Sequence, residues 1–315
     1  MTPALAIIPP DPDARDFAAE LQASTVACRL RHERLGTRRA LTRGQIEQVA
    51  ERFAADRRAL SGSKRLLDTK DPAFRAVMRV HAAATDYWHS MTVPFPEAGI
   101  RLIRRERVQE FQQRMEEFRT SLVRSARQLQ AKYAELRERA RDELGSLFND
   151  GDYPPRVDDA FSLDWDFPSV EPPNYLRQLA PELYARESER MRGRFEEAIR
   201  LTEAAFLERF GELVRHLAER LSGEADGRPK VFRASAITNL SAFFDEFQRL
   251  DIGSSSELQD LVSRAQRLVQ GVRPDDLRSD FTTRTAVAAG LAEIQDVMDG
   301  MMVARPRRAI SLVED

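Results

Sequence analysis

Two long stretches of helical apolar periodicity constrain the fold of this 315-residue chain more than any other feature. Within each stretch, apolar side chains recur at steps of three and four, which places them on one stripe of an α-helix. The first stripe contains Val108, Phe111, Met115, Phe118, Leu122, Ala126, Leu129, Tyr133, Leu136, Ala140, Leu144 and Leu147. The second contains Met191, Phe195, Ala198, Thr202, Phe206, Phe210, Leu213, Leu217 and Leu221. Because a connector joins the two stretches, we expect them to fold back as a long antiparallel coiled-coil hairpin.

The complete pattern predicts a mainly α protein in three parts. Residues 1–103 form an N-terminal α/β cap, residues 104–222 form the long helical hairpin, and residues 223–315 form a C-terminal helical module. Within the hairpin, an acidic arm rich in proline and aspartate covers 149–173. Pro181 follows this arm, and a proline inside a helix removes a backbone hydrogen bond. We therefore expect a kink or a separate short helix before Pro181.

Two short segments of the cap alternate between apolar and polar residues, as a half-buried strand does. These segments are Val26–Leu30 and Ile100–Ile103. Pairing them would satisfy the backbone groups of both, and we expect this small two-stranded sheet to be the only regular β-structure. The glycine and serine residues of the SGSKRLL stretch, residues 61–67, predict a loop.

Composition limits the broad class of protein. The 49 basic and 51 acidic residues give a net charge of −2, so the whole chain has no strong attraction to nucleic acid or anionic membranes. A single Cys28 excludes an internal disulfide and a cysteine-based metal cage. No apolar run approaches the roughly 18 residues of a membrane-spanning helix, so we expect no membrane association. The first residues lack the pattern of a signal peptide, which makes the cytoplasm the expected location.

No coherent catalytic or metal site is apparent. Ser61 and Lys64 match the spacing of an S-x-x-K acyltransferase motif, but that chemistry needs a helix and these residues lie in an expected loop. His81 and His89 lie two helical turns apart, roughly 12 Å, which is too far for one metal ion. The stretch 149–152 is similar to the start of a calcium loop but lacks its ligand spacing. We therefore expect a protein that is no enzyme and holds no cofactor or metal.

The acidic arm is the first candidate binding surface. Aromatic side chains flanked by aspartates suit docking on a basic, grooved protein partner. The alternative is that these aromatic residues pack on the protein's own hairpin. The candidate partner-binding residues are Tyr153, Phe161, Trp165, Asp166 and Phe167.

A run of arginines around the first predicted strand is the second candidate. It contains Glu33 as its one acidic residue and could contact phosphates. The alternative is a solvated edge strand that its charges protect from aggregation. The candidate nucleic-acid-binding residues are Arg29, Arg31, Arg34, Arg38, Arg39 and Arg43.

Several short motifs occur in a recognisable order along most of the chain. They are Leu35-Gly36-x-Arg38-Arg39-x-Leu41-Thr42, the stretch Gly62-Ser63-Lys64-Arg65-Leu66-Leu67-Asp68, Val93-Pro94, Arg284, and Pro306-Arg307-Arg308-x-Ile310. Their order resembles an uncharacterised family of helical bacterial and phage proteins. That family is often encoded beside MoxR-type AAA ATPases and von Willebrand-type proteins of the cobaltochelatase CobT kind. The resemblance implies an accessory or adaptor role beside an ATPase, and it implies no catalytic residues.

We therefore expect a non-enzymatic scaffold or adaptor that binds another protein, with a MoxR-type AAA ATPase or its von Willebrand-domain system as the candidate partner. The alternative is a nucleic-acid-associated protein of a phage or mobile element, which would use the arginine run. The sequence leaves the oligomeric state open.

Overall fold

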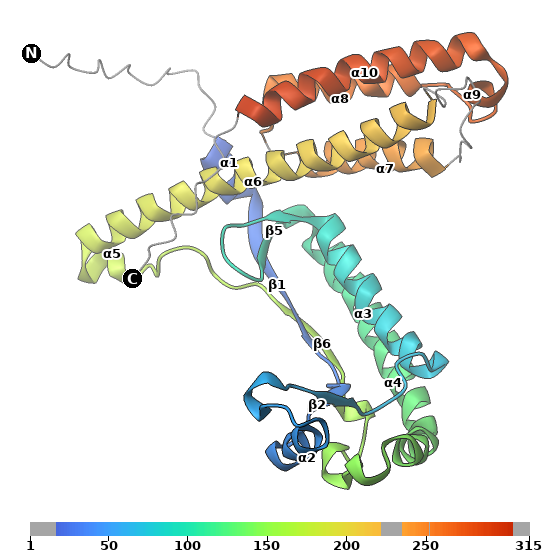
Figure 1. Ribbon diagram of the computed structural model, residues 1–315. Helices are drawn as coiled ribbons and strands as arrows, with labels where there is room; N and C mark the ends of the chain where they lie inside the picture. Colours follow the sequence, from blue (N-terminus) through green and yellow to red (C-terminus); the bar gives the residue numbers. More distant parts are fainter. Residues whose placement is uncertain (1–16, 222–234, 252, 305–315) are drawn as a thin grey trace, which may run out of the picture. The chain divides into compact units, whose positions relative to one another are not determined.

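A computed structural model describes residues 17–221, 235–251 and 253–304 of the chain (Figure 1). The α-helices are α1 (Phe17–Ser24), α2 (Arg43–Phe53), α3 (Pro72–Met91), α4 (Val108–Leu144), α5 (Leu176–Leu179), α6 (Pro181–Leu221), α7 (Ser235–Leu250), α8 (Ser256–Val269), α9 (Asp276–Ser279) and α10 (Phe281–Ala304). The strands are β1 (Thr25–Glu33), β2 (Arg38–Ala40), β3 (Ser63–Arg65), β4 (Thr92–Pro94), β5 (Ile100–Arg104) and β6 (Ser162–Asp166). Short 3₁₀ turns are η1 (Arg57–Ala59), η2 (Arg105–Arg107), η3 (Gly145–Leu147), η4 (Asp150–Asp152) and η5 (Asp158–Ala160). The mainly α class is thus confirmed, with a small antiparallel sheet near the N-terminus and a helical C-terminal region.

The chain divides into two compact units, each built from separate stretches of sequence. Unit 1 comprises Met1–Thr25, Val93–Ala98 and Val170–Asp315, and unit 2 comprises Val26–Thr92 and Gly99–Ser169. The predicted boundaries at 103 and 222 do not coincide with these units. The helical pattern along the chain predicted three consecutive parts, whereas the packing groups stretches that are distant in sequence.

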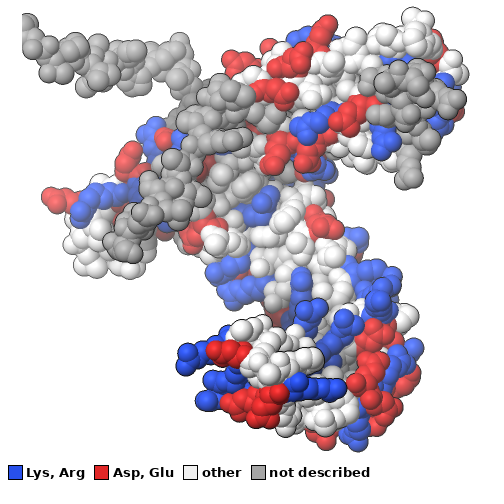
Figure 2. All heavy atoms as spheres, viewed as in Figure 1, with Lys and Arg blue, Asp and Glu red and all other residues white. Residues whose placement is uncertain are grey.

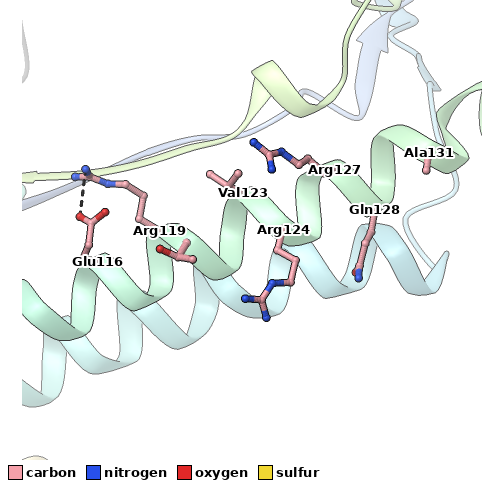
Figure 3. A pocket seen from close by; sticks show the side chains of 8 residues that line it. Glu116, Arg119, Val123, Arg124, Arg127, Gln128 and Ala131 are labelled. Carbon is pink, nitrogen blue, oxygen red and sulfur yellow. Dashed lines mark ion pairs between the residues drawn. The ribbon is translucent and has the colours of Figure 1, made fainter.

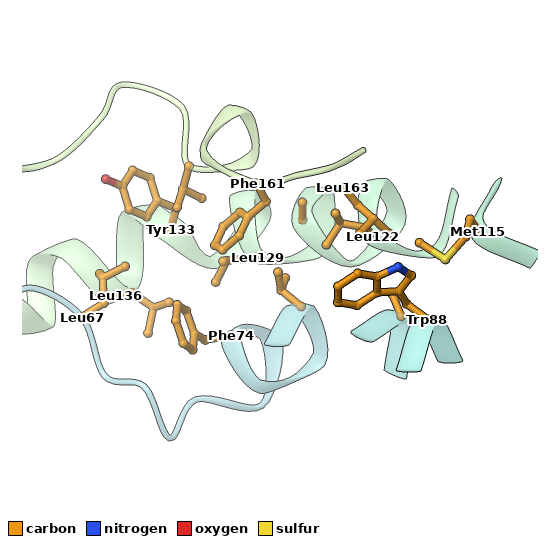
Figure 4. Packing of buried hydrophobic residues seen from close by; sticks show 14 of the residues in the cluster. Leu67, Phe74, Trp88, Met115, Leu122, Leu129, Tyr133, Leu136, Phe161 and Leu163 are labelled. Carbon is orange, nitrogen blue, oxygen red and sulfur yellow. The ribbon is translucent and has the colours of Figure 1, made fainter. Parts of the chain in front are cut away.

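The core of unit 2 lies mainly between α3 and α4, which run in opposite directions (Figure 4). Phe74, near the start of α3, lies at the Leu136 end of the cluster, and Trp88, near the end of α3, lies at the Met115 end. The stripe predicted on the first long helix is buried in this core. Its buried members are Phe111, Met115, Leu122, Ala126, Leu129, Tyr133, Leu136 and Ala140.

The predicted pairing of the two long helices is wrong, because each helix has its partners in its own unit. Leu122 of α4 lies in the core of unit 2, and Phe118 contacts a tyrosine of α3. Phe206 and Phe210 of α6 pack instead against Phe243 of α7, with ring centroids 6.2 and 5.2 Å away. An apolar stripe specifies which face of a helix is buried but not what covers it. Here α3 and α7 carry apolar stripes of their own, and α3 covers the stripe of α4 while α7 covers Phe206 and Phe210 of α6.

In unit 1, α6 packs against α10, α1 and α7. The short segment Val93–Ala98 joins this unit, because Phe95 contacts Phe195 edge-on at 5.5 Å. Pro181 is the first residue of α6, and the separate short helix α5 precedes it. The expected break before this proline is therefore confirmed.

The β-structure exceeds the prediction. A four-stranded sheet has the order β4-β5-β1-β6, so the expected pairing of Val26–Leu30 with Ile100–Ile103 is confirmed as β1 beside β5. Strand β6 comes from the acidic arm and pairs antiparallel with β1. A second, two-stranded sheet joins β2 to β3 inside the stretch expected to be a loop. Strands of three residues are too short to show a clear alternation in sequence.

Candidate functional site

The aromatic residues of the arm pack on the protein itself. Tyr153 and Phe161 are buried in the core of unit 2, with 7% and 8% of their surface exposed. Trp165 and Phe167 are half-buried, and both rings approach Phe111 of α4 edge-on at 6.5 and 6.3 Å. The alternative considered from sequence was packing on the protein's own hairpin; Tyr153 and Phe161 do pack on the protein itself, in the core of unit 2 that includes α4. A role of Trp165 and Phe167 in binding a partner stays a prediction.

Asp166 of the arm meets two arginines of the basic run. It lies opposite Arg29 in the β1–β6 register, and their side chains form an ion pair at 2.6 Å. Arg31 reaches the same carboxylate at 2.9 Å. The hydrogen bond from Arg29 and the positive charge of both arginines hold the pKa of Asp166 below its usual value, despite partial burial. These three residues therefore tie the arm to β1.

The remaining arginines of the run divide into two kinds. Arg39 lies 3.3 Å from Asp152, and Arg43 pairs at 3.0 Å with a glutamate one turn later on α2. Arg34 and Arg38 are exposed and form no ion pair within the part of the chain that the structure describes. The structure thus brings most of the run into internal ion pairs and leaves these two guanidinium groups available.

A groove of about 630 Å³ lies along the outer face of α4 (Figure 3). Arg119, Val123 and Arg127 project from one side of the helix, and Arg124 and Gln128 project from the other. Val123 is 44% exposed and supplies apolar surface between these arginines. The complete lining is Glu116, Arg119, Thr120, Val123, Arg124, Arg127, Gln128 and Ala131.

Arg119 is held in place at one end of this groove. Its guanidinium group lies 3.3 Å from Glu116 and 3.5 Å from Asp164 of the arm. It also stacks over the ring of Trp165 at 4.4 Å, a cation–π contact. The half-buried aromatic residue of the arm thus fixes a side chain of the groove.

Arg124 and Arg127 are the available charges of the groove. Both are exposed, and neither guanidinium group forms an ion pair or hydrogen bond among the described residues. The positive charge of Arg127 acts on Asp158, but that carboxylate is bound by Arg156 at 2.7 Å. The sequence analysis did not predict this groove, because the apolar stripe of the helix indicates only its buried face. The sequence signal that could have indicated the groove is Val123, an apolar residue outside the stripe, followed by arginines one and four residues later.

Lys64 and Asp150, two of the residues weighed as catalytic or metal-binding, form ion pairs within the protein. Lys64 is buried on β3, and its Nζ lies 2.6 Å from Asp152 and 2.5 Å from the carbonyl oxygen of Leu147, to which it donates. Asp150, in the stretch similar to a calcium loop, pairs with Arg137 at 2.6 Å. No group of three histidine, cysteine or carboxylate side chains among the described residues could hold a metal ion. None of the described helices is long and apolar enough to cross a membrane.

No protein-family model matches this chain, and no curated protein or solved structure is significantly similar to it. Its function is therefore inferred from the surfaces described above.

Proposed function

We propose that this chain is a non-enzymatic adaptor that binds another protein through the α4 groove. The observation that supports the proposal most is the combination of exposed Val123 with the guanidinium groups of Arg124 and Arg127. A helix surface of this kind complements a segment that carries apolar side chains beside carboxylates. The partner would therefore be a protein with an acidic amphipathic helix.

The surroundings of the groove support an acidic partner. Unit 2 contains 27 basic and 21 acidic residues, a formal charge of +6, whereas the whole chain carries −2. A basic unit attracts an acidic partner and speeds the encounter. Arg119 is already ordered by Trp165 and Asp164, so binding would cost little side-chain entropy at that position.

The resemblance described above implies one partner to test first, a MoxR-type AAA ATPase. We propose that such an ATPase, or the von Willebrand-type protein encoded with it, presents the acidic segment. An apolar side chain placed over Val123 and carboxylates near Arg124 and Arg127 would form the centre of the contact. Residues at the centre of an interface commonly supply most of its binding energy.

The first experiment uses two synthetic helical peptides of about 20 residues that share one leucine stripe. In one peptide glutamates flank the stripe, and in the other lysines do. The full chain should bind the glutamate peptide, and the Arg124→Glu/Arg127→Glu variant should lose at least about tenfold in affinity because it replaces attraction with repulsion. Equal binding of both peptides, or of neither, would reject the groove as an acidic-helix site.

A matched control comes from the same helix. Lys132 and Arg139 are exposed residues of α4 outside the groove lining, so the Lys132→Glu/Arg139→Glu variant makes the same change in net charge. This control should keep the affinity of the wild type for the glutamate peptide. The same three proteins can then be immobilised to capture a purified MoxR-type ATPase from the same genome. Capture by the control but not by the groove variant would identify the partner.

A further inference from the structure

The β2–β3 hairpin carries two pairs of basic residues on opposite faces. In its antiparallel register Arg38 lies opposite Arg65, and Arg39 lies opposite Lys64. Residues directly opposite each other share a face, and successive residues of a strand alternate between faces. Arg39 and Lys64 therefore share one face, and Arg38 and Arg65 share the other.

The face with Arg39 and Lys64 has a counter-ion from within the protein. Asp152 lies between these two side chains, 2.6 Å from Lys64 and 3.3 Å from Arg39. The hydrogen bond from Lys64, followed by the charges of both cations, holds the pKa of Asp152 below its usual value. Two like charges can oppose each other here because a carboxylate is shared between them.

The face with Arg38 and Arg65 has no such carboxylate. Both arginines are exposed, and neither forms an ion pair or hydrogen bond among residues 17–221, 235–251 and 253–304. The next cross-strand pair on this face, Ala40 and Ser63, is small and also exposed. Like charges directly opposite on a sheet are destabilising. The face with Arg38 and Arg65, called the outer face below, therefore lacks an anion of the kind that Asp152 supplies to the face with Arg39 and Lys64.

We infer that the outer face of this hairpin binds the phosphate backbone of a nucleic acid. Two adjacent guanidinium groups match the oxygens of a phosphodiester in charge and in hydrogen-bonding geometry. The protein would be a nucleic-acid-binding adaptor, with this face distinct from the α4 groove. This activity does not depend on the proposed protein partner.

The charge around the hairpin indicates a polyanion rather than one small anion. Residues 29–65 contain eleven basic and four acidic residues. Figure 2 shows Lys and Arg side chains around the part of unit 2 that carries β2 and α2, with fewer acidic ones among them. Arg34, Arg52 and Arg58 are further exposed arginines whose side chains form no ion pair in the described residues. An extended phosphate backbone can contact several of these groups at once.

One exposed aromatic residue favours nucleic acid over other polyanions. Phe53 ends α2 and is 72% exposed, and Val49, one turn earlier, is 39% exposed. Glu51 and Asp56 also lie in this region, and Asp56 accepts a hydrogen bond from the backbone of Arg58. An exposed aromatic ring among arginines can stack on a nucleic-acid base. A carboxylate polymer offers no ring for such a contact.

The test measures binding of a fluorescent single-stranded DNA of about 20 nucleotides to the full chain at increasing salt concentration. The wild type should bind at low salt, and its affinity should fall as salt rises. The Arg38→Gln/Arg65→Gln variant should bind at least about tenfold more weakly at low salt. Its salt slope, which is the steepness with which the logarithm of the affinity falls against the logarithm of the salt concentration, should be smaller by about 1.4. This corresponds to about 0.7 for each phosphate that the variant no longer neutralises. Unlabelled polyglutamate should fail to compete.

The matched control replaces two arginines in the other unit. Arg190 and Arg200 are exposed on α6 and pair with glutamates of their own helix, so Arg190→Gln/Arg200→Gln makes the same change in net charge. This control should keep the wild-type affinity and salt slope. The inference is overturned if the wild type does not bind DNA, if both double variants lose affinity equally, or if polyglutamate competes as well as DNA. Equal melting temperatures of the variants and the wild type confirm that each protein is folded.

Discussion

His32 of β1 and His81 of α3 face each other through their Nδ1 atoms at a distance of 2.9 Å. His81 is fully buried. The hydroxyl of Thr85 donates to the carbonyl oxygen of His81 at 2.9 Å, so it accepts from Nε2 of His32 at 3.0 Å. This network assigns the proton of His32 to Nε2, and Nδ1 of His81 must then donate to Nδ1 of His32. A proton on Nδ1 of His32 would place two N–H groups against each other. A proton on Nε2 of His81 would be buried without an acceptor among the described residues, so both rings are neutral in this arrangement.

The histidine pair predicts a loss of stability in mild acid. Burial lowers the pKa of His81 to about 4, with further lowering by repulsion from His32 whenever that ring is protonated and from the positive charge of Arg34. Burial and Arg34 also lower the pKa of His32. An unfolded histidine takes up its proton near pH 6.5, so the unfolded state binds more protons as the pH falls from about 6.5 to about 4. The free energy of unfolding, measured with denaturant at a series of pH values, should fall by roughly 3 kcal/mol over this range through His81.

Two variants separate this effect from general acid denaturation. His81→Gln removes the buried titrating group and keeps an amide that can donate to His32, so the pH dependence above about pH 4 should become flatter. His216 is exposed on α6, and His216→Gln should keep the wild-type profile. A steep loss of stability that persists in His81→Gln would show that other groups are responsible.

Lys64 should stabilise unit 2 through its buried ion pair with Asp152. Replacing Lys64 by methionine keeps most of the side-chain volume but leaves Asp152 with only the more distant Arg39. Removing one partner of a buried pair typically costs about 3 kcal/mol or more, because the other charge stays desolvated. Denaturant unfolding should show this loss at neutral pH. Lys70 is exposed, and Lys70→Met should change the free energy of unfolding by less than about 0.5 kcal/mol.

The depressed pKa of Asp152 gives this ion pair a pH dependence of its own. The pKa of Asp152 is lowered in the folded state, whereas an aspartate in the unfolded chain has a pKa of about 4. The ionised carboxylate therefore stabilises the protein fully at pH values above about 4, and this stabilisation is lost as the pH falls further. The stability difference between the wild type and Lys64→Met should therefore shrink below about pH 4. A difference that is constant with pH would contradict an ionic origin.

Trp165 and Phe167 should contribute to folding as well as to any binding. Both rings pack against Phe111, and Trp165 also supports the guanidinium group of Arg119. Replacing both with alanine removes half-buried surface, so we expect the free energy of unfolding to fall by about 3 kcal/mol. Tyr175→Ala is the control, because that side chain is 62% exposed. A double variant with the melting temperature of the wild type would instead favour a pure docking role.

The sequence predicts local structure in this protein better than it predicts long-range partners. Pro181 marks the start of α6, and the alternation of Val26–Leu30 marks part of β1. These signals depend on each residue's own backbone preferences and immediate neighbours. The buried stripe of α4 was also predictable, since its period follows from helix geometry.

The partners of these elements were not predictable in the same way. Nothing in the stripe around Leu122 distinguishes α3 from α6 as the helix that covers it. The two long stripes are closer to each other in length than to the shorter α3, so the sequence favoured the wrong pairing. The arginine pair of Arg38 and Arg65 depends on a register between three-residue strands, which the sequence alone does not specify. The groove around Val123 lies on the outer face of a helix whose periodicity reports only the inner face.

A double-mutant cycle tests which helix covers α6. Phe210 and Phe243 are fully buried and stacked, with ring centroids 5.2 Å apart and planes inclined by 4°. Each substitution to alanine should cost about 3–5 kcal/mol, and the pair should show a coupling energy of about 0.5–1.5 kcal/mol because the rings contact each other. Phe210→Ala combined with Leu122→Ala should be additive, since Leu122 lies in the core of unit 2. Coupling between Phe210 and Leu122, measured by denaturant unfolding, would instead support the pairing of the two long helices.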